Sequence, residues 1–207
     1  GEQPQMPELN PRMFIVCGSI NPISVAQCEY AESKGARRFR LTPGQKLSPK
    51  WTQTRDSESL VQEILNSCQN HPVVILDTNG AGDPERTDSY AAWHGFSPEQ
   101  TRMNIVASMG HLTERLIDIG LDSTILIMGG DLLFQFIKQA GMKAIAPVCE
   151  LKRGIVLSQV TYKGKKRNII SKSGGFGDKA RCSKDMNLKA PRAVFSGESF
   201  LENIVAT

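Results

Sequence analysis

Glycine-rich turns follow three short apolar runs in this sequence, and their residue types are those that bind anions. The turns are Gly18-Ser19-Ile20-Asn21-Pro22, Gly129-Gly130-Asp131 and Lys172-Ser173-Gly174-Gly175-Phe176-Gly177. Glycine lets the backbone approach a ligand closely and adopt positive φ. Amide N–H groups at the start of a following helix, together with the positive end of its dipole, attract phosphate. Three such turns at one sheet edge could hold a whole nucleotide.

The third turn carries the strongest of the three signals. Three glycines, a serine and a lysine within six residues cost more backbone entropy than a simple turn requires. Lys172 can also supply a point charge to a phosphate. By contrast, Gly129-Gly130 taken alone is a common strand-to-helix turn, and Ser19 taken alone is more often a turn or cap residue.

Asp131 needs a separate explanation, because a carboxylate repels phosphate unless it caps a helix or holds a cation. Capping is the usual role of aspartate at a helix start. A magnesium role stays open, since Mg²⁺ at phosphoryl-transfer sites is held by one or two carboxylates together with the phosphates.

Several well-known catalytic motifs are missing from the sequence. It contains no G-x-x-x-x-G-K-[ST] phosphate loop, no complete G-x-G-x-x-G fingerprint and no G-x-S-x-G elbow. Its three histidines are far apart and lack metal-ligand spacing. These absences argue against P-loop proteins and serine hydrolases, and they disfavour an NAD-dependent oxidoreductase.

The elements that position the turns can be predicted from apolar runs and helical periodicity. Strands that are each followed by a helix indicate a mainly parallel sheet. A late hairpin around Lys163-Gly164-Lys165-Lys166 makes the sheet mixed. The segment 77–93 is polar and is predicted to be a long loop. Strands are predicted at 13–17, 38–41, 73–76, 123–128, 143–148, 154–162 and 167–171, and helices at 23–34, 56–70, 97–119, 132–139 and 197–206.

We therefore predict an α/β fold, with a mixed, largely parallel sheet flanked by helices and a late β-hairpin, in a single domain. Residues 1–11 are expected to be a disordered or extended segment, and residues 12–207 to form the domain. The chain has 207 residues, and 40% of them are hydrophobic, which is ordinary globular composition.

Charge and cysteine content limit the partners. The net charge of +4 is too mild to indicate nucleic acid, but it suits a protein that handles phosphates. No apolar run reaches the length of a membrane span, so we expect neither a membrane nor a nucleic-acid partner. The five cysteines are scattered, which predicts reduced thiols and a cytoplasmic protein.

Taken in order, the three turns resemble the nucleotide-binding domain of the four-carbon acid sugar kinases. The family's Gly-Ser-x-Ser-x-x-Thr-x-x-Gln stretch corresponds to residues 18–27, and its Gly-Gly-Glu-Thr to Gly129-Gly130-Asp131-Leu132. Its Lys-Ser-Gly-Asn-Phe-Gly signature is nearly intact at residues 172–177. The resemblance covers residues 13–179.

The resemblance implies that the protein binds ATP with Mg²⁺ and serves the phosphorylation of a four-carbon sugar acid such as threonate, erythronate or 3-oxo-tetronate. Asp131 is the candidate magnesium ligand. The implied nucleotide contacts are Ser19, Gly129, Gly130, Asp131, Leu132, Lys172, Ser173, Gly174, Gly175, Phe176 and Gly177.

Two departures from the family pattern each remove a hydroxyl group: Asn21 stands in place of a serine, and Leu132 in place of a threonine. The family kinases also carry a sugar-acid domain before the region that matches here. We therefore expect this chain to be the ATP-binding half, with the sugar acid and the catalytic base supplied elsewhere. A non-catalytic regulatory nucleotide-binding module is the alternative function. The sequence leaves open whether the chain forms a homodimer.

Overall fold

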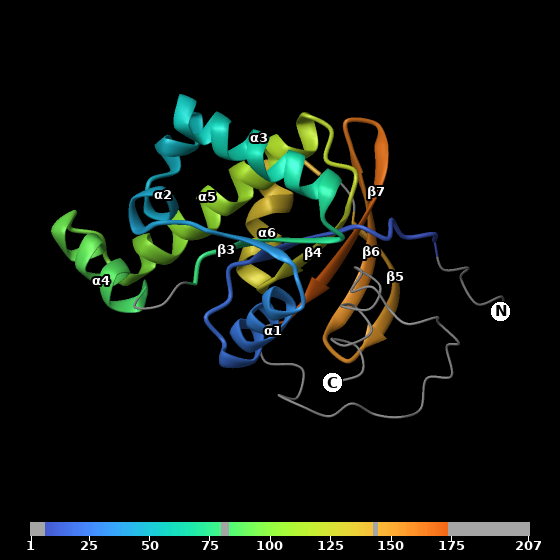
Figure 1. Ribbon diagram of the computed structural model, residues 1–207, viewed down its shortest axis with the longest axis horizontal. Coiled ribbons are helices and arrows are strands. Elements are labelled where there is room, and N and C mark those ends of the chain that lie inside the picture. Colours follow the sequence, from blue (N-terminus) through green and yellow to red (C-terminus); the bar gives the residue numbers. More distant parts are fainter. Residues whose placement is uncertain (1–6, 80–82, 143–144, 174–207) are drawn as a thin grey trace.

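The computed structural model describes residues 7–79, 83–142 and 145–173, which form one seven-stranded sheet with helices on both faces (Figure 1). The strand order is β2-β3-β1-β4-β7-β6-β5. Pairing is parallel from β2 to β7 and antiparallel from β7 to β5. The strands are β1 (Met13–Cys17), β2 (Arg37–Arg40), β3 (Val73–Asp77), β4 (Thr124–Met128), β5 (Ile145–Lys152), β6 (Ile155–Tyr162) and β7 (Lys165–Lys172).

The three central strands are buried at every position, as continuous apolar runs predict for parallel strands covered on both faces. Their last residues are aligned, because Cys17 of β1 pairs with Asp77 of β3 and with Met128 of β4. Met128 pairs in turn with Lys172 of β7. The predicted mixed, largely parallel sheet is confirmed, and its parallel strands end in one row.

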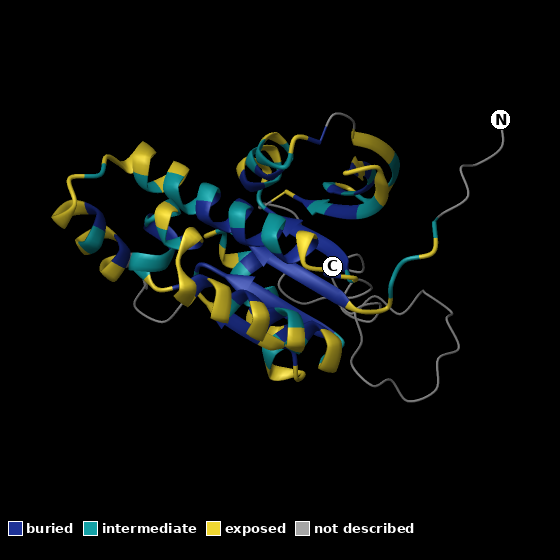
Figure 2. Cartoon of the chain, turned by 90° about the horizontal axis from the view of Figure 1, so that it is seen from above, coloured by how far each residue is buried: buried dark blue, intermediate teal, exposed yellow. Residues whose placement is uncertain are grey.

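Helices cover the two faces of the sheet unequally. Val61, Met109 and Phe136, from α3, α5 and α6, pack in one core with Phe14 of β1. Cys28 of α1 packs in the core of the other face, and Figure 2 shows buried strands between exposed outer helix surfaces. The helices are α1 (Pro22–Ser33), α2 (Pro43–Leu47), the 3₁₀ helix η1 (Pro49–Gln53), α3 (Arg55–Asn70), α4 (Asp83–Trp93), α5 (Pro98–Asp118) and α6 (Gly130–Gln139).

Helix starts follow their capping signals. Ser97-Pro98-Glu99-Gln100 has the residue pattern of a capping box, and the Ser97 hydroxyl and the Gln100 side chain form it at the start of α5. Helix α3, predicted at 56–70, begins at Arg55, because Thr54 is its N-cap and its side chain accepts the amide of Ser57.

The prediction of a long loop at 77–93 is wrong, because α4 occupies residues 83–93. This helix has no broad apolar stripe: Thr87 and Ala91 are buried, while Trp93 is 88% exposed. It packs against α2 rather than against the sheet, so helical periodicity gave no signal. Pro43-Gly44, a dipeptide typical of turns, is likewise the start of a helix, α2.

The predicted hairpin is confirmed as β6 and β7, joined by Lys163 and Gly164, both at positive φ. Its second strand returns to pair with β4 in parallel, which brings Lys172 to the carboxyl edge of the sheet. The helix predicted at 197–206 lies outside the described residues. No helix among the described residues is long and apolar enough to cross a membrane.

Candidate functional site

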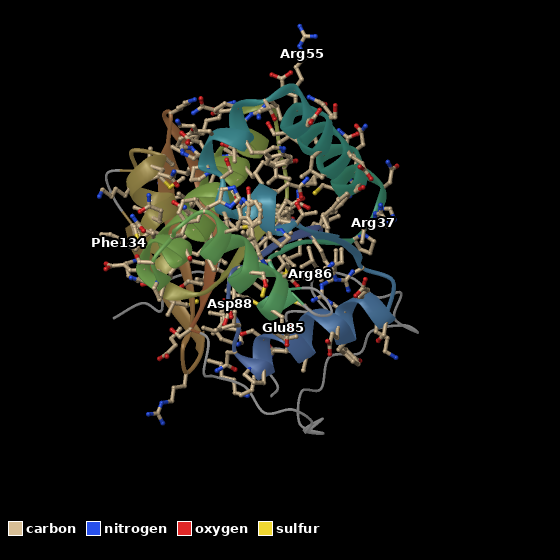
Figure 3. The ribbon with its side chains drawn as sticks, turned by 90° about the vertical axis from the view of Figure 1, so that its left-hand side faces the viewer. Arg37, Arg55, Glu85, Arg86, Asp88 and Phe134 are labelled. Atoms are coloured by element: carbon tan, nitrogen blue, oxygen red, sulfur yellow. The ribbon has the colours of Figure 1, made fainter. Side chains whose placement is uncertain are left out.

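The three glycine-rich turns begin side by side at the carboxyl edge of the sheet. The Gly18 amide donates to the Met128 carbonyl at 3.2 Å, and the Gly129 amide donates to the Lys172 carbonyl at 3.1 Å. These two hydrogen bonds bring the first two turns and the start of the third together. Figure 3 views the molecule from the side of α4, with Glu85, Arg86 and Asp88 of that helix in front. Gly174, Gly175, Phe176 and Gly177 lie outside the described residues.

A crevice for ligands is expected between β1 and β4. These strands are neighbours in the sheet, yet α1 follows β1 onto one face while α6 follows β4 onto the other. In open α/β sheets, ligands bind outside the carboxyl ends of strands where the connections diverge in this way. We call this place the β1–β4 switch point, and the first two turns lie there.

The N-terminus of α6 is built to receive an anion. Its N-cap is Gly129, which has φ +123° and offers no side chain to cap the helix. The amide of Leu133 is bonded to the Gly129 carbonyl, but the amides of Gly130, Asp131 and Leu132 precede it without a capping side chain. A methyl group on Gly130 would meet no atom of residues 7–79, 83–142 and 145–173 within 4 Å. With respect to this part of the chain, the first turn of α6 therefore faces open space.

The N-terminus of α1 is closed by its own side chains. Asn21 accepts the amide of Ile23 at 2.9 Å, and the Ser19 hydroxyl accepts the amide of Asn21 at 3.2 Å. Asn21, which replaces the family's serine, thus acts as a helix cap. The Ser19 hydroxyl shapes its own turn, so its side chain is already engaged.

Leu132 lies in the core rather than in the crevice. Its side chain is 2% exposed, and a methyl group added to Gly18 would lie 3.2 Å from its Cδ2 atom. Leu132 therefore holds the first two turns together, and Gly18 must lack a side chain for them to approach. Of the predicted contacts, Leu132 can offer a ligand only its backbone.

Asp131 forms an ion pair with Arg102 of α5, at 2.6 Å between Oδ2 and Nη1. Both side chains are more than half exposed, and such pairs contribute at most about 1 kcal/mol, so either group can turn to a ligand. Asp131 is not the helix cap, since Gly129 holds that position. Arg102 was not predicted as a site residue, because nothing in its own helix distinguishes it from other surface arginines.

A buried charge network supports the Ser19 turn from below. The Arg38 guanidinium donates to the Asp77 carboxylate at 2.8 Å and 2.5 Å, and both side chains are almost fully buried. Asp77 also accepts the Asn79 side-chain amide at 2.8 Å, and that amide donates to the Ser19 carbonyl at 3.0 Å. Burial opposes the charge on Arg38, but Asp77 raises the pKa of the guanidinium above its ordinary value.

This network was not predicted from the sequence. Arg38 and Asp77 lie on different strands, and the one signal that the sequence offers is the position of Asp77 directly after the apolar run Val73–Leu76.

Cys17, Cys28 and Asp77 place their donor atoms within 4.8 Å of one another. Asp77 is already held by Arg38, and a hydrogen bond from Cys17 together with burial raises the pKa of the Cys28 thiol well above its usual range. A protonated thiol and an arginine-bound carboxylate are poor ligands for a divalent cation. We interpret these three groups as core residues.

Thiol labelling tests this description of the cysteines. Burial raises the pKa of the Cys68 thiol to about 12, so it stays protonated and unreactive through pH 9. In a Cys182→Ser variant, which removes the cysteine outside the described residues, we expect Ellman's reagent to label Cys149 quickly. Cys17, Cys28 and Cys68, which are buried, should react only after unfolding. A second fast thiol that persists in a Cys149→Ser control would contradict the structure.

The third turn starts with two residues of opposite exposure. Lys172 is only 1% exposed, and its Nζ atom lies 3.4 Å from the Ser24 hydroxyl of α1. Ser173 is exposed, and its amide donates to the Gly154 carbonyl at 3.0 Å. Both predicted site residues thus reach the carboxyl edge, one beneath it and one on its surface.

Two cavities lie at the opposite, amino-terminal edge of the sheet. One, of about 450 Å³, is lined by residues 120–125 and 165–168, among others. The second, of about 470 Å³, includes Arg12, Leu65 and Cys68 in its lining. Neither contains a residue from the three turns.

Solved structures share this fold at low sequence identity. A Bordetella bronchiseptica protein of the DUF1537 family, solved with bound citrate as a domain-swapped dimer, is 19% identical over 83% of this chain, with a TM-score of 0.59. A Haemophilus influenzae protein of that family is 17% identical over 83% of the chain, with a TM-score of 0.61. A Salmonella typhimurium LT2 protein provisionally described as a tRNA synthase is 17% identical over 83%, with a TM-score of 0.64.

The match covers 39%, 38% and 39% of those three chains, respectively, so this chain spans about two fifths of their length. No curated protein matches it. Residues 14–181 match the family described as nucleotide-binding C-terminal domain. The sequence resemblance, the uncapped helix start at the switch point and this match over most of the chain lead to one conclusion: the chain belongs to the family of nucleotide-binding C-terminal domains.

Proposed function

We propose that this chain is the ATP-binding half of a kinase that phosphorylates a four-carbon sugar acid of the threonate, erythronate or 3-oxo-tetronate type. The observation that carries the proposal is the meeting of the Gly18 and Gly129 turns at the β1–β4 switch point. There the uncapped first turn of α6 faces open space. An uncapped helix start is a general phosphate site. Because the chain belongs to a nucleotide-binding family, we expect the bound phosphate to be part of a nucleotide.

Each described residue has a proposed task. The amides of Gly130, Asp131 and Leu132 would bind phosphate oxygens, and Ser19 would shape the opposing turn. Lys172 would supply positive charge from beneath, and Ser173 would lead into residues 174–177, which the family resemblance implies as nucleotide contacts. Phosphoryl transfer depends mainly on positioning and charge neutralisation, which main-chain amides and one lysine can provide.

A magnesium ion fits the donor set with Asp131 as its protein ligand. The Asp131 carboxylate is 67% exposed, whereas Asp77 is buried and bound to Arg38. Mg²⁺ usually takes one or two carboxylates, and phosphates and water complete its shell. When bound, it would neutralise charge on the phosphates, and Arg102 would be released from Asp131 toward the same anion.

The sugar acid and the base that accepts its proton are proposed to come from a separate domain. This chain spans about two fifths of the solved chains that it resembles, which leaves room in those proteins for an acceptor-binding part. A regulatory module that binds nucleotide without catalysis is the second candidate. It is favoured by Leu132, whose buried side chain brings no hydroxyl to the first turn of α6.

Calorimetric titration with MgATP tests the nucleotide site. We expect binding by the unaltered chain, and about tenfold weaker binding or less by Gly130→Asp, because a carboxylate at the first helical position repels phosphate but suits the helix dipole. Ser59→Asp, which adds the same charge on an exposed face of α3, should bind like the unaltered chain. Absence of heat with the unaltered chain, or equal binding by Gly130→Asp, would contradict the site.

Complementation separates the two candidate functions. The acceptor-binding part of a full-length relative would be mixed with this chain, MgATP and four-carbon sugar acids. ATP consumption that depends on both components and on the acid supports the kinase. Nucleotide binding without consumption favours the regulatory module.

A further inference from the structure

The ammonium group of Lys172 is buried and has no acidic partner among the described residues. Lys172 is 1% exposed, and the one hydrogen bond that its ammonium group makes to the described residues is the long contact to Ser24 Oγ at 3.4 Å. No carboxylate from residues 7–79, 83–142 or 145–173 forms an ion pair with it. Buried charges in proteins are ordinarily paired, so this lysine lacks the anion that its burial requires.

The sheet register fixes where this charge lies. Lys172 shares a row with Met128 and Cys17, and Met128 and Cys17 belong to the core on the α1 face. Its ammonium group therefore lies beneath the first turn of α1, where the helix dipole is also positive. Asp77 is in the same row, but its backbone lies three strands away, at about 14 Å, and its carboxylate is bound to Arg38.

This arrangement is unfavourable in the absence of a ligand. Burial lowers the pKa of Lys172, although the nearby cysteines oppose that effect. An unpaired charge in such a place is typically less stable than an apolar residue of similar size. A bound anion at the β1–β4 crevice would supply the missing negative charge.

We propose that Lys172 is a buried counter-charge for a chain of at least two phosphates that crosses the β1–β4 edge, retained at the expense of the stability of the ligand-free protein. This inference rests on the proposed nucleotide site. The α6 amides act on one face of the sheet and Lys172 on the other. A single phosphate bound to the α6 amides would lie on the α6 face of the sheet. A chain of two or more phosphates could also extend toward the α1 face, where Lys172 lies.

The test compares Lys172→Met with Lys138→Met, which removes an equal charge from an exposed position of α6. Thermal unfolding is measured without ligand, and calorimetry with ATP, AMP and inorganic tripolyphosphate. We expect Lys172→Met to unfold at a temperature about 2–4 °C higher and to bind ATP and tripolyphosphate about tenfold more weakly or worse. Its affinity for AMP should change little, and Lys138→Met should match the unaltered chain throughout.

Three outcomes would overturn the inference while leaving nucleotide binding intact: unchanged ATP affinity in Lys172→Met, an equal loss for AMP and ATP, or a lower unfolding temperature. Failure of Lys172→Met to fold also counts against it, because the inference requires the variant to be the more stable protein. Absence of ATP and tripolyphosphate binding by the unaltered chain would instead remove the proposed function and this inference together.

Discussion

Replacement of Asp77 by asparagine is expected to lower the free energy of unfolding by about 2–3 kcal/mol, because it removes the buried one of the two carboxylates that neutralise Arg38 and leaves only the partly exposed Glu32, at 3.0 Å. Arg38 is 2% exposed at its side chain and Asp77 is 0% exposed, so water cannot compensate for the loss. The same carboxylate accepts both the backbone and side-chain amides of Asn79. Urea unfolding followed by circular dichroism measures the change as a shift of the midpoint at constant slope.

The control for this prediction is the double variant Arg38→Met with Asp77→Leu, which removes both charges. Replacing a buried ion pair by apolar residues is often neutral or stabilising. The double variant should therefore be clearly more stable than Asp77→Asn. If Asp77→Asn unfolds at the same urea concentration as the unaltered chain, the pair is not buried as described. If the double variant were less stable than Asp77→Asn, the two side chains would stabilise the fold through contacts other than the attraction between their charges.

Gly129→Ala is expected to destabilise the protein by about 1–3 kcal/mol, because Gly129 has φ +123° and side chains rarely adopt that conformation. Space is not the obstacle, since the nearest atoms to an added methyl lie at 3.9 Å. The altered turn should also misplace the first amides of α6, so that MgATP binds more weakly. Thermal unfolding and calorimetry measure the two effects.

Gly130→Ala is the matched control in the neighbouring residue. Gly130 has no positive φ, an added methyl meets nothing within 4 Å, and alanine suits a helix better than glycine by up to about 1 kcal/mol. We expect this variant to be as stable as the unaltered chain or more stable. Equal destabilisation by both substitutions would mean that the turn does not require the positive φ of Gly129.

The sequence predicted those parts of the fold whose signals are local. Apolar runs located β1, β3 and β4, and the Ser97–Gln100 pair located the start of α5. Helix α4 was not predicted, because it packs against α2 rather than against the sheet and buries few residues. A segment that packs on another surface element has no periodicity tied to the main core, so neither composition nor spacing reveals it.

The candidate site was predictable as far as glycines mark turns. That the Gly18 and Gly129 turns converge follows from parallel pairing, and the structure confirms it. The supporting residues were not predictable, because Asn79 contacts Ser19, and Arg102 contacts Asp131, across long sequence separations. Nor could the sequence tell that Leu132 turns its side chain into the core, since its position after Asp131 fits either orientation.

The return of β7 alongside β4 has a consequence for how the protein matures. Lys172 reaches the carboxyl edge of the sheet only after a two-residue turn at Lys163 and Gly164 has set the hairpin and the hairpin has docked against β4. Strand β4 must itself pair with β1, which joins residues 13–17 to residues 124–128, the widest sequence separation among the strand pairs described, and contacts of high sequence separation form slowly. During synthesis and refolding, ligand competence should therefore be among the last properties to be acquired, after the helical signal has already returned.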